Sequence, residues 1–163
     1  MASTSKRIIG IDPGTGRLGF GVIDVVNGKP VLVDAGVITT PSHTEESDRL
    51  LTIYDELSQL VKDLKPTSMA VEKLFFAQNV TTAMNVAQAR GVILLIGKQA
   101  GLELYEYTPL QIKMALTGYG KASKQQIQEM VRVLLGLKEI PKPDDAADAL
   151  AIALIHSHQL KFS

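Results

Sequence analysis

The sequence contains no cysteine, which excludes disulfide frameworks, thiolate metal sites and cysteine nucleophiles. It also contains no tryptophan, so a tryptophan-lined cage for a quaternary amine is excluded. Any metal ligands therefore have to be carboxylates or the three histidines, His43, His156 and His158.

Long apolar runs are missing as well. No stretch reaches the roughly 18 uninterrupted apolar residues of a membrane span. The opening MASTSKR holds no apolar segment of signal-peptide length. We therefore expect a cytoplasmic protein without membrane association. A hydrophobic share of 45% and a charged share of 21% are typical of a globular chain, and 163 residues correspond to about one domain.

A net charge of one sign is absent too, because 17 Lys and Arg residues balance 17 Asp and Glu residues. The charges are unevenly distributed, however, with anions concentrated in segment 41–72 and cations in segment 111–138. The cations of the second segment are Lys113, Lys121, Lys124, Arg132 and Lys138. A basic face is compatible with a neutral total, although two ordinary solvated helices would have the same composition.

Apolar periodicity predicts three consecutive strands followed by alternating helices and strands. Strands are expected at 7–12, 18–26, 30–39, 68–71 and 102–107, and helices at 45–64, 79–100, 109–118, 124–135 and 144–158. Asn27-Gly28 is a strong two-residue hairpin signal. This order favours an α/β fold with a mixed five-stranded sheet flanked by helices. No linker interrupts it, so we expect a single domain over 1–163, with 1–5 as a flexible tail.

Four carboxylates occupy positions that could converge. Asp12 and Glu72 end two apolar strands, where open sheets bind their ligands. Asp145 and Asp148 lie three apart, on one face of an alanine-rich helix. Hard divalent cations prefer oxygen ligands, and two such ions can activate a water and stabilise the leaving oxygen of an in-line displacement. The set therefore suits phosphodiester hydrolysis. Each acid alone has a plainer interpretation: a turn residue, a surface acid, or anions at a helix N-terminus.

The stretch Ile9–Val22, IGIDPGTGRLGFGV, resembles the opening of the RuvC Holliday-junction resolvases, the bacterial crossover junction endodeoxyribonucleases. The resemblance spans about residues 7–158. Its further blocks are Val71-Glu72 with Phe75, Gln88-Ala-Arg-Gly91, Tyr107-Thr-Pro109, Gly118–Lys124 and Asp145–Ala151. The stretch 12–16 also resembles the first phosphate-binding hairpin of sugar kinases and actin-type ATPases. Those proteins need a second such hairpin in a second domain, which this chain lacks, and it has no Walker loop either.

The RuvC resemblance implies an RNase H-like fold and a homodimer that cuts two symmetric strands of a four-way DNA junction. It implies Mg²⁺ as cofactor, expected as two ions per subunit with Mn²⁺ as a substitute, and RuvA and RuvB as partners. The catalytic and metal-binding positions that it implies are Asp12, Glu72, Asp145 and Asp148. Cleavage would leave a 5′-phosphate and a 3′-hydroxyl. Asp144 adds an acid beside Asp145, so the register rests on the Asp-x-x-Asp spacing.

The resemblance also places basic and aromatic residues near the scissile phosphate. Lys124 is expected to act in catalysis by steadying the non-bridging oxygens. The DNA-binding set expected with it is Phe75, Phe76, Lys113, Lys121, Lys124 and Arg132. Aromatic stacking on an unpaired base is worth roughly 1–3 kcal/mol. Which of the two phenylalanines reaches DNA stays open, and His156 is expected at the surface or as a cap.

The helix expected at 79–100 is apolar on two faces. One face contains Val80, Ala83, Met84, Ala87, Gly91, Leu94 and Leu95; the other contains Val86, Ala89, Ile93 and Ile96. Burial on two sides would fit a sheet on one side and a second subunit on the other, although burial within the monomer alone remains an alternative. Two further functions also stay open: a junction-binding protein without catalysis, and another RNase H-like enzyme such as an RNA-processing nuclease.

Overall fold

A computed structural model describes residues 5–14, 16–73 and 79–160 of the chain. The described chain begins with the strands β1 (Lys6–Asp12), β2 (Arg17–Val26) and β3 (Lys29–Thr39), then α1 (Glu46–Leu64), β4 (Ser68–Glu72), α2 (Val80–Gln99) and β5 (Glu103–Tyr107). It ends with α3 (Pro109–Thr117), α4 (Lys124–Leu134) and α5 (Asp144–Leu160). Residues 1–4 of the predicted tail lie outside the described residues.

The five strands form one mixed sheet in the order β3-β2-β1-β4-β5. β1, β2 and β3 pair antiparallel, whereas β4 lies parallel to both β1 and β5. The predicted hairpin is confirmed, because Asn27 and Gly28 have φ angles of 52° and 78°, as its tight turn requires. The parallel register Ile11↔Val71 brings the carboxyl ends of β1 and β4 to the same edge of the sheet.

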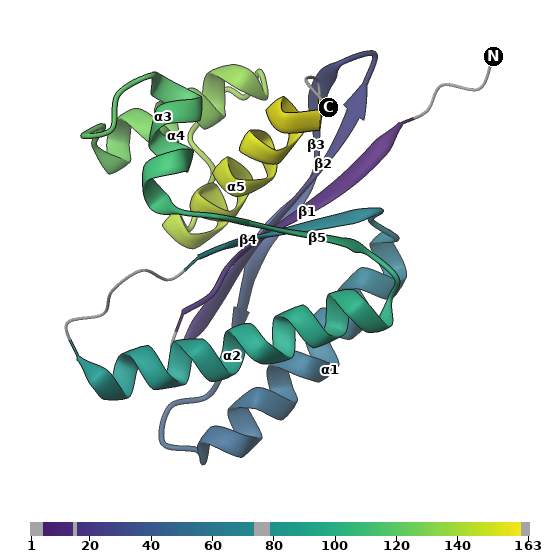
Figure 1. Cartoon of the computed structure of the whole chain (residues 1–163), viewed down its shortest axis with the longest axis vertical. Coiled ribbons are helices and arrows are strands. Elements are labelled where there is room, and N and C mark those ends of the chain that lie inside the picture. The colour runs from purple at the N-terminus through teal and green to yellow at the C-terminus, as the bar shows by residue number, and fades with distance from the viewer. Residues whose placement is uncertain (1–4, 15, 74–78, 161–163) are drawn as a thin grey trace.

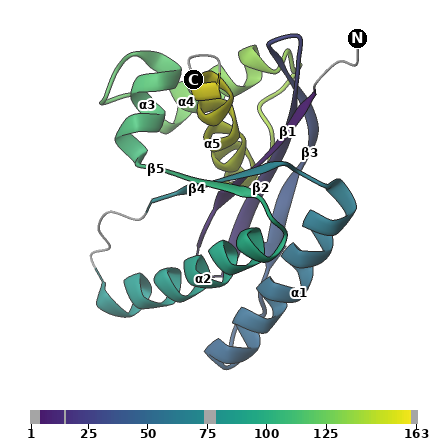
Figure 2. The same cartoon turned by 45° about the vertical axis from the view of Figure 1, so that its right-hand side comes forward.

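Helices cover both faces of the sheet, with α3, α4 and α5 on one face and α1 and α2 on the other (Figure 1). Figure 2 shows the same two layers after a 45° turn. Successive side chains of β1 point to opposite faces of the sheet and so contribute to both cores. Ile8 packs with α5 residues, whereas Ile9 and Ile11 pack with α1 and α2 residues.

Local capping sets several helix starts. Asn79 accepts hydrogen bonds from the backbone of Thr81 and Thr82 at the start of α2. Thr108 and Ser123 each form a capping box at the starts of α3 and α4. These caps explain why the predicted starts of the three helices differ from the observed ones by at most one residue.

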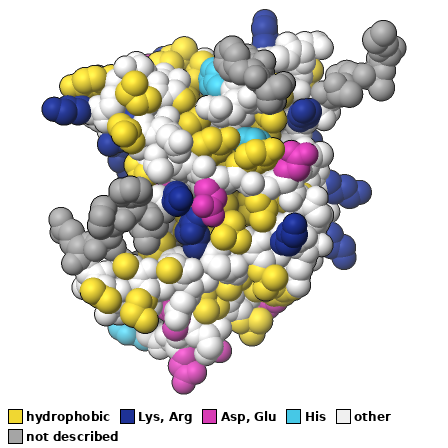
Figure 3. Space-filling model, viewed as in Figure 1, with side chains coloured by type: hydrophobic (Ala, Val, Ile, Leu, Met, Phe, Trp, Pro, Cys, Tyr) yellow, Lys and Arg dark blue, Asp and Glu magenta, His cyan; other side chains and the backbone are white. Residues whose placement is uncertain are grey.

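The two-faced character of α2 is confirmed for its inner face. Val86, Ala89, Ile93 and Ile96 are buried. Val80, Met84 and Leu95 are exposed large apolar side chains on the opposite face, where Ala87 and Gly91 are exposed as well. We call these five residues the α2 stripe. Apolar side chains gather over the lower part of the molecule, where α2 lies (Figure 3).

By length and composition alone, α2 is long and apolar enough to cross a membrane, with 28% of the stretch buried. Its buried face packs on the sheet and α1 in the core of the fold, so the apolar residues of that face have a structural explanation without a bilayer.

The expectation for His156 was wrong. The residue is 1% exposed and lies in the core of α5. Its Nδ1 atom is hydrogen-bonded to the Tyr107 hydroxyl at 2.7 Å, and its ring centroid is 4.2 Å from that of Tyr105. His156 lies four residues after Ile152, so both side chains are on the face of α5 that packs against the sheet. Burial lowers the pKa of His156 to about 4.

Candidate metal centre and nucleic-acid interface

Glycines in the sheet allow α5 to lie directly on β1 and β2. A Cβ at Gly10 would lie 2.2 Å from the backbone oxygen of Ala149, and one at Gly19 would lie 2.1 Å from the backbone oxygen of Asp145. Both distances are shorter than any side chain tolerates. The backbone of α5, on its alanine-rich face, therefore lies in direct contact with the glycines of the strands. The first turn of the helix lies beside the end of β1.

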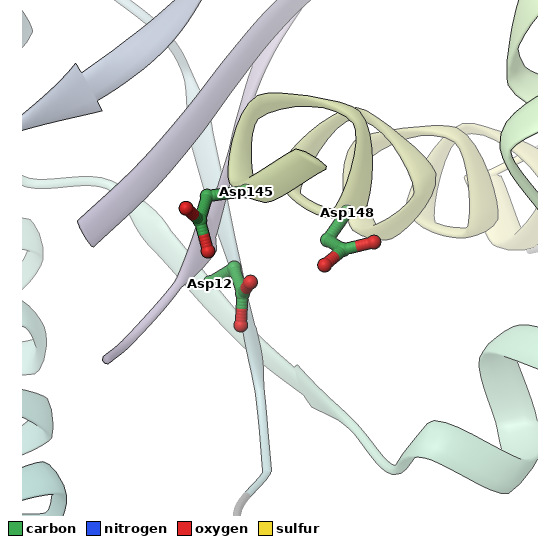
Figure 4. A group of neighbouring side chains, drawn as sticks. All are labelled: Asp12, Asp145 and Asp148. Atoms are coloured by element: carbon green, nitrogen blue, oxygen red, sulfur yellow. The ribbon is translucent and has the colours of Figure 1, made fainter. Parts of the chain in front are cut away.

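This packing brings Asp12, Asp145 and Asp148 together. One carboxylate oxygen from each lies within 4.8 Å of the others. Figure 4 shows the three side chains pointing toward one another, Asp12 from the strand and the other two from successive turns of α5. We call these three residues with Glu72 the acidic cluster. Glu72 joins it through its carboxyl group, which is hydrogen-bonded to that of Asp12.

Burial and mutual repulsion hold a proton in the acidic cluster. Burial, then the hydrogen bond and charge of Glu72, then the charges of Asp148 and Asp145, raise the pKa of Asp12 to about 9. Burial also raises the pKa of Asp148, an effect that Lys124 opposes. A set of oxygen donors that cannot all ionise by themselves is the environment in which a hard divalent cation replaces protons. The residues therefore fit such a cation.

Two cations border the acidic cluster. The Nζ atom of Lys124 lies 3.3 Å from Asp148 and 3.7 Å from Asp144. Arg17 lies 3.6 Å from Asp145 through its Nη1 atom. Asp144 is thus an outer partner of Lys124, and the three-carboxylate group contains Asp145 in its place, which agrees with the Asp-x-x-Asp register.

Two hollows meet at Lys124. One, of about 260 Å³, is lined by Asp12, Glu72 and Asp148 together with Lys113 and Lys124. The other, of about 710 Å³, is lined by Arg17, Lys124 and Lys142 beside Asp144 and Asp145. A path between them would lead a polyanion across the acidic cluster with cations on both sides.

The remaining predicted DNA contacts are less directly placed. Lys121 is exposed in the loop before α4 and lines neither hollow. Arg132 is hydrogen-bonded to Glu129 and to the backbone carbonyl of Leu137. Phe75 and Phe76 lie outside the described residues.

Sequence reasoning assigned no role to Arg17, Lys142 or Arg90, although the blocks Ile9–Val22 and Gln88–Gly91 of the resemblance contain the two arginines. Arg17 is the first residue of β2 and lies two residues before Gly19, which pairs with Asp12 at the end of β1. Lys142 precedes Pro143 just before α5, so its nearness to Asp145 was readable from the chain. Arg90 contacts the backbone of Glu72 and the side chain of Glu106, and no spacing rule predicts such a contact.

Comparisons with known proteins agree with the geometry. The family model "Crossover junction endodeoxyribonuclease RuvC" matches residues 8–156. The RuvC of Desulfitobacterium hafniense (strain DSM 10664 / DCB-2) is 56% identical over 153 residues, which cover 94% of this chain and 93% of that protein. The RuvC of Roseiflexus sp. (strain RS-1) is 54% identical over 155 residues, with 95% and 92% covered.

A solved structure of T. thermophilus RuvC in complex with Holliday junction substrate is 37% identical and matches with a TM-score of 0.91 over 96% of both chains. This match confirms the predicted RNase H-like α/β fold. The family match, the close relatives and the shared fold together show that the chain belongs to the RuvC family of crossover junction endodeoxyribonucleases.

Proposed function

We propose that this chain resolves Holliday junctions in recombination and DNA repair, by making paired symmetric nicks in two strands of like polarity. The observation that carries the proposal is the convergence of Asp12, Asp145 and Asp148 at one edge of the sheet. Glu72 is hydrogen-bonded to Asp12 there. The relatives named as crossover junction endodeoxyribonucleases, and the T. thermophilus RuvC solved with a Holliday junction, support the substrate.

The four acids of the acidic cluster would hold Mg²⁺, two ions per subunit, or Mn²⁺ in its place. Bound there, the cations would supply Lewis-acid activation of water and stabilisation of the leaving 3′-oxygen, as in other two-metal sites. The chain's own part is to gather the four carboxylates without neutralising them fully, because Lys124 and Arg17 each contact only one edge of the cluster. Hydrolysis would give 5′-phosphate and 3′-hydroxyl ends.

Lys124 is the residue best placed to act on the scissile phosphate, because it lines both hollows. Its ammonium group would steady the non-bridging oxygens. Lys113 lines the hollow that contains Glu72, and with Lys121 and Arg132 it would add phosphate contacts. Phe75 and Phe76, just after Glu72 in the chain, would supply stacking on unpaired bases.

The protein would work as a homodimer, with the α2 stripe as the interface. The stripe contains the large apolar residues Val80, Met84 and Leu95 on either side of the small residues Ala87 and Gly91. Small residues let two helices approach closely, and a two-fold axis would direct two sites at two strands. An Ala87→Glu variant should dissociate into monomers in sedimentation experiments. We propose RuvA and RuvB as partners in a cytoplasmic pathway.

A synthetic four-way junction with end-labelled strands tests the function. We expect symmetric nicks in two opposing strands when Mg²⁺ is present, and none with EDTA. Binding without nicks under Mg²⁺ or Mn²⁺ would favour a non-catalytic junction binder. Equal cleavage of RNA or linear duplex would favour a different RNase H-like enzyme.

A further inference from the structure

Arg90 contacts the ends of two parallel strands from a helix that lies outside the sheet. It belongs to α2, and 19% of its side chain is exposed. Its Nε atom donates a long hydrogen bond, 3.4 Å, to the backbone carbonyl of Glu72, the last residue of β4. Its Nη2 atom forms an ion pair with Glu106, in β5. One side chain therefore holds α2, β4 and β5 together next to the acidic cluster.

The end of β4 needs such a contact, because its pairing is one-sided there. The register between β1 and β4 stops at Ile11↔Val71. Glu72 pairs with Tyr107 of β5, and Lys73 donates its backbone N–H to the Tyr107 carbonyl at 2.7 Å. A strand end that has lost one neighbour takes its position from the other contacts of its backbone groups. Arg90 provides one of them.

The charge of Arg90 is compensated away from the acidic cluster. Its Nη2 atom is buried and, within the described part of the chain, has no hydrogen-bond partner of good geometry. The carboxylate of Glu106 therefore compensates it as an ion pair. Arg90 touches Glu72 through the backbone, so the Glu72 carboxyl group stays available to Asp12. The contact can fix the position of that carboxyl without adding a cation to the metal site.

We propose that Arg90 is a positioning residue of the nuclease. It holds the end of β4 so that the Glu72 carboxyl stays beside Asp12, while Glu106 keeps the guanidinium in place. The inference rests on the proposed function only in taking Asp12 and Glu72 as metal ligands. Loss of a group that contacts and orients a metal ligand, without binding the metal itself, typically weakens metal affinity about 10- to 100-fold.

Two variants separate positioning from plain stability. Arg90→Ala should raise the Mg²⁺ concentration for half-maximal single-turnover cleavage about 10-fold or more. Calorimetric titration with Mn²⁺, without DNA, should show the same loss of affinity. The double variant Arg90→Ala/Glu106→Ala no longer leaves a carboxylate unpaired, so it should regain melting temperature. It should keep the metal defect, because the hydrogen bond from Arg90 to the Glu72 carbonyl is still missing. Should Arg90→Ala fail to fold, the double variant and Arg90→Lys serve as the test.

The chain offers a matched control. Arg7 pairs with Asp24 at 2.8 Å and donates to the backbone carbonyl of Leu64 at 2.7 Å, at the start of β1 instead of its end. Arg7→Ala/Asp24→Ala should leave the metal requirement unchanged. Recovery of both melting temperature and metal requirement in Arg90→Ala/Glu106→Ala would overturn the proposal. If the wild type binds Mn²⁺ but cuts no junction, the proposed function fails and calorimetry still tests Arg90. If it binds no divalent cation, both fail.

Discussion

The Cα atom of Gly19 faces the backbone carbonyl of Asp145 so closely that a methyl group on it would lie 2.1 Å from that oxygen. The contact places the first turn of α5 on β2 and determines how far Asp145 lies from Asp12. It joins the hairpin at the start of the chain to the acidic helix near its end. The acidic cluster therefore depends on a residue that has no side chain.

Gly19→Ala should destabilise the fold and weaken metal binding together. The neighbouring atom is backbone and cannot rotate away, so α5 has to move from the sheet, at a cost of roughly 1–3 kcal/mol. Urea unfolding and Mn²⁺ calorimetry measure the two effects. Gly36→Ala is the control, because its added Cβ would meet the ring of Phe20 at 3.0 Å, a side chain that can shift. Normal metal affinity in Gly19→Ala would mean that α5 tolerates displacement.

Asp12→Asn should stabilise the metal-free protein while reducing cleavage. The folded-state pKa of Asp12 is raised to about 9, above its ordinary value of 3.8, so the stability from this group falls as pH rises between those values. Asn is neutral throughout. The gain in free energy of unfolding of Asp12→Asn over the wild type should therefore vanish below about pH 4 and reach roughly 1–3 kcal/mol at pH 8.

The measurement is thermal or urea unfolding of both proteins in EDTA across that pH range, with cleavage measured separately in Mg²⁺. Asp55→Asn, on the exposed side of α1, is the control and should change neither quantity. Cleavage by Asp12→Asn should fall about 100-fold or more while junction binding persists. Full cutting would remove Asp12 from the mechanism.

The placement of the four acids was predictable in part from local rules. Asp12 and Glu72 end apolar strands, and the spacing of Asp145 and Asp148 places both on one helix face. The parallel register Ile11↔Val71 then brings the two strand ends to one edge, as open sheets usually do. The resemblance to RuvC selected these four among all the carboxylates of the chain.

Contacts between distant side chains were not predictable in this way. His156 looks like a polar residue near a helix end, yet its face of α5 turns toward the sheet and buries it against Tyr105 and Tyr107. Arg90 is one arginine in an apolar helix, and only the folded chain brings it to Glu72 and Glu106. Periodicity indicates which face is buried and not which residue lies opposite.

His156 should make the protein sensitive to mild acid. Burial is the main cause that lowers its pKa to about 4; Lys6 lowers the pKa further, and Glu103 opposes both. The folded-state pKa lies below the ordinary 6.5, so stability from this group is present above pH 6.5 and lost as pH falls toward 4. We expect a loss of roughly 2 kcal/mol across that window.

Unfolding between pH 7 and 4 measures this loss. His156→Phe should be less stable at pH 7, because it removes the hydrogen bond to the Tyr107 hydroxyl. The decrease in its free energy of unfolding between pH 7 and 4 should nevertheless be smaller than that of the wild type. His43→Asn, in an exposed turn with a φ of 66°, should keep the wild-type slope. An unchanged slope in His156→Phe would show that other groups cause the acid sensitivity.

Arg17→Ala should change DNA and metal binding in opposite directions. The guanidinium lies 3.6 Å from Asp145 and borders the hollow shared by Lys124 and Lys142. Removing it takes away one phosphate contact, so junction affinity should fall and the slope of log affinity against log salt should decrease by about 0.9. It also removes a cation that competes at Asp145. Mn²⁺ affinity should therefore rise by the small factor expected of an exposed ion pair, about 2- to 5-fold.

Lys62→Ala, on α1 beside the opposite edge of the sheet, should alter neither the junction affinity nor the Mn²⁺ affinity. A parallel loss of both affinities would indicate a folding defect, and no change in either would exclude Arg17 from the path of the DNA strand.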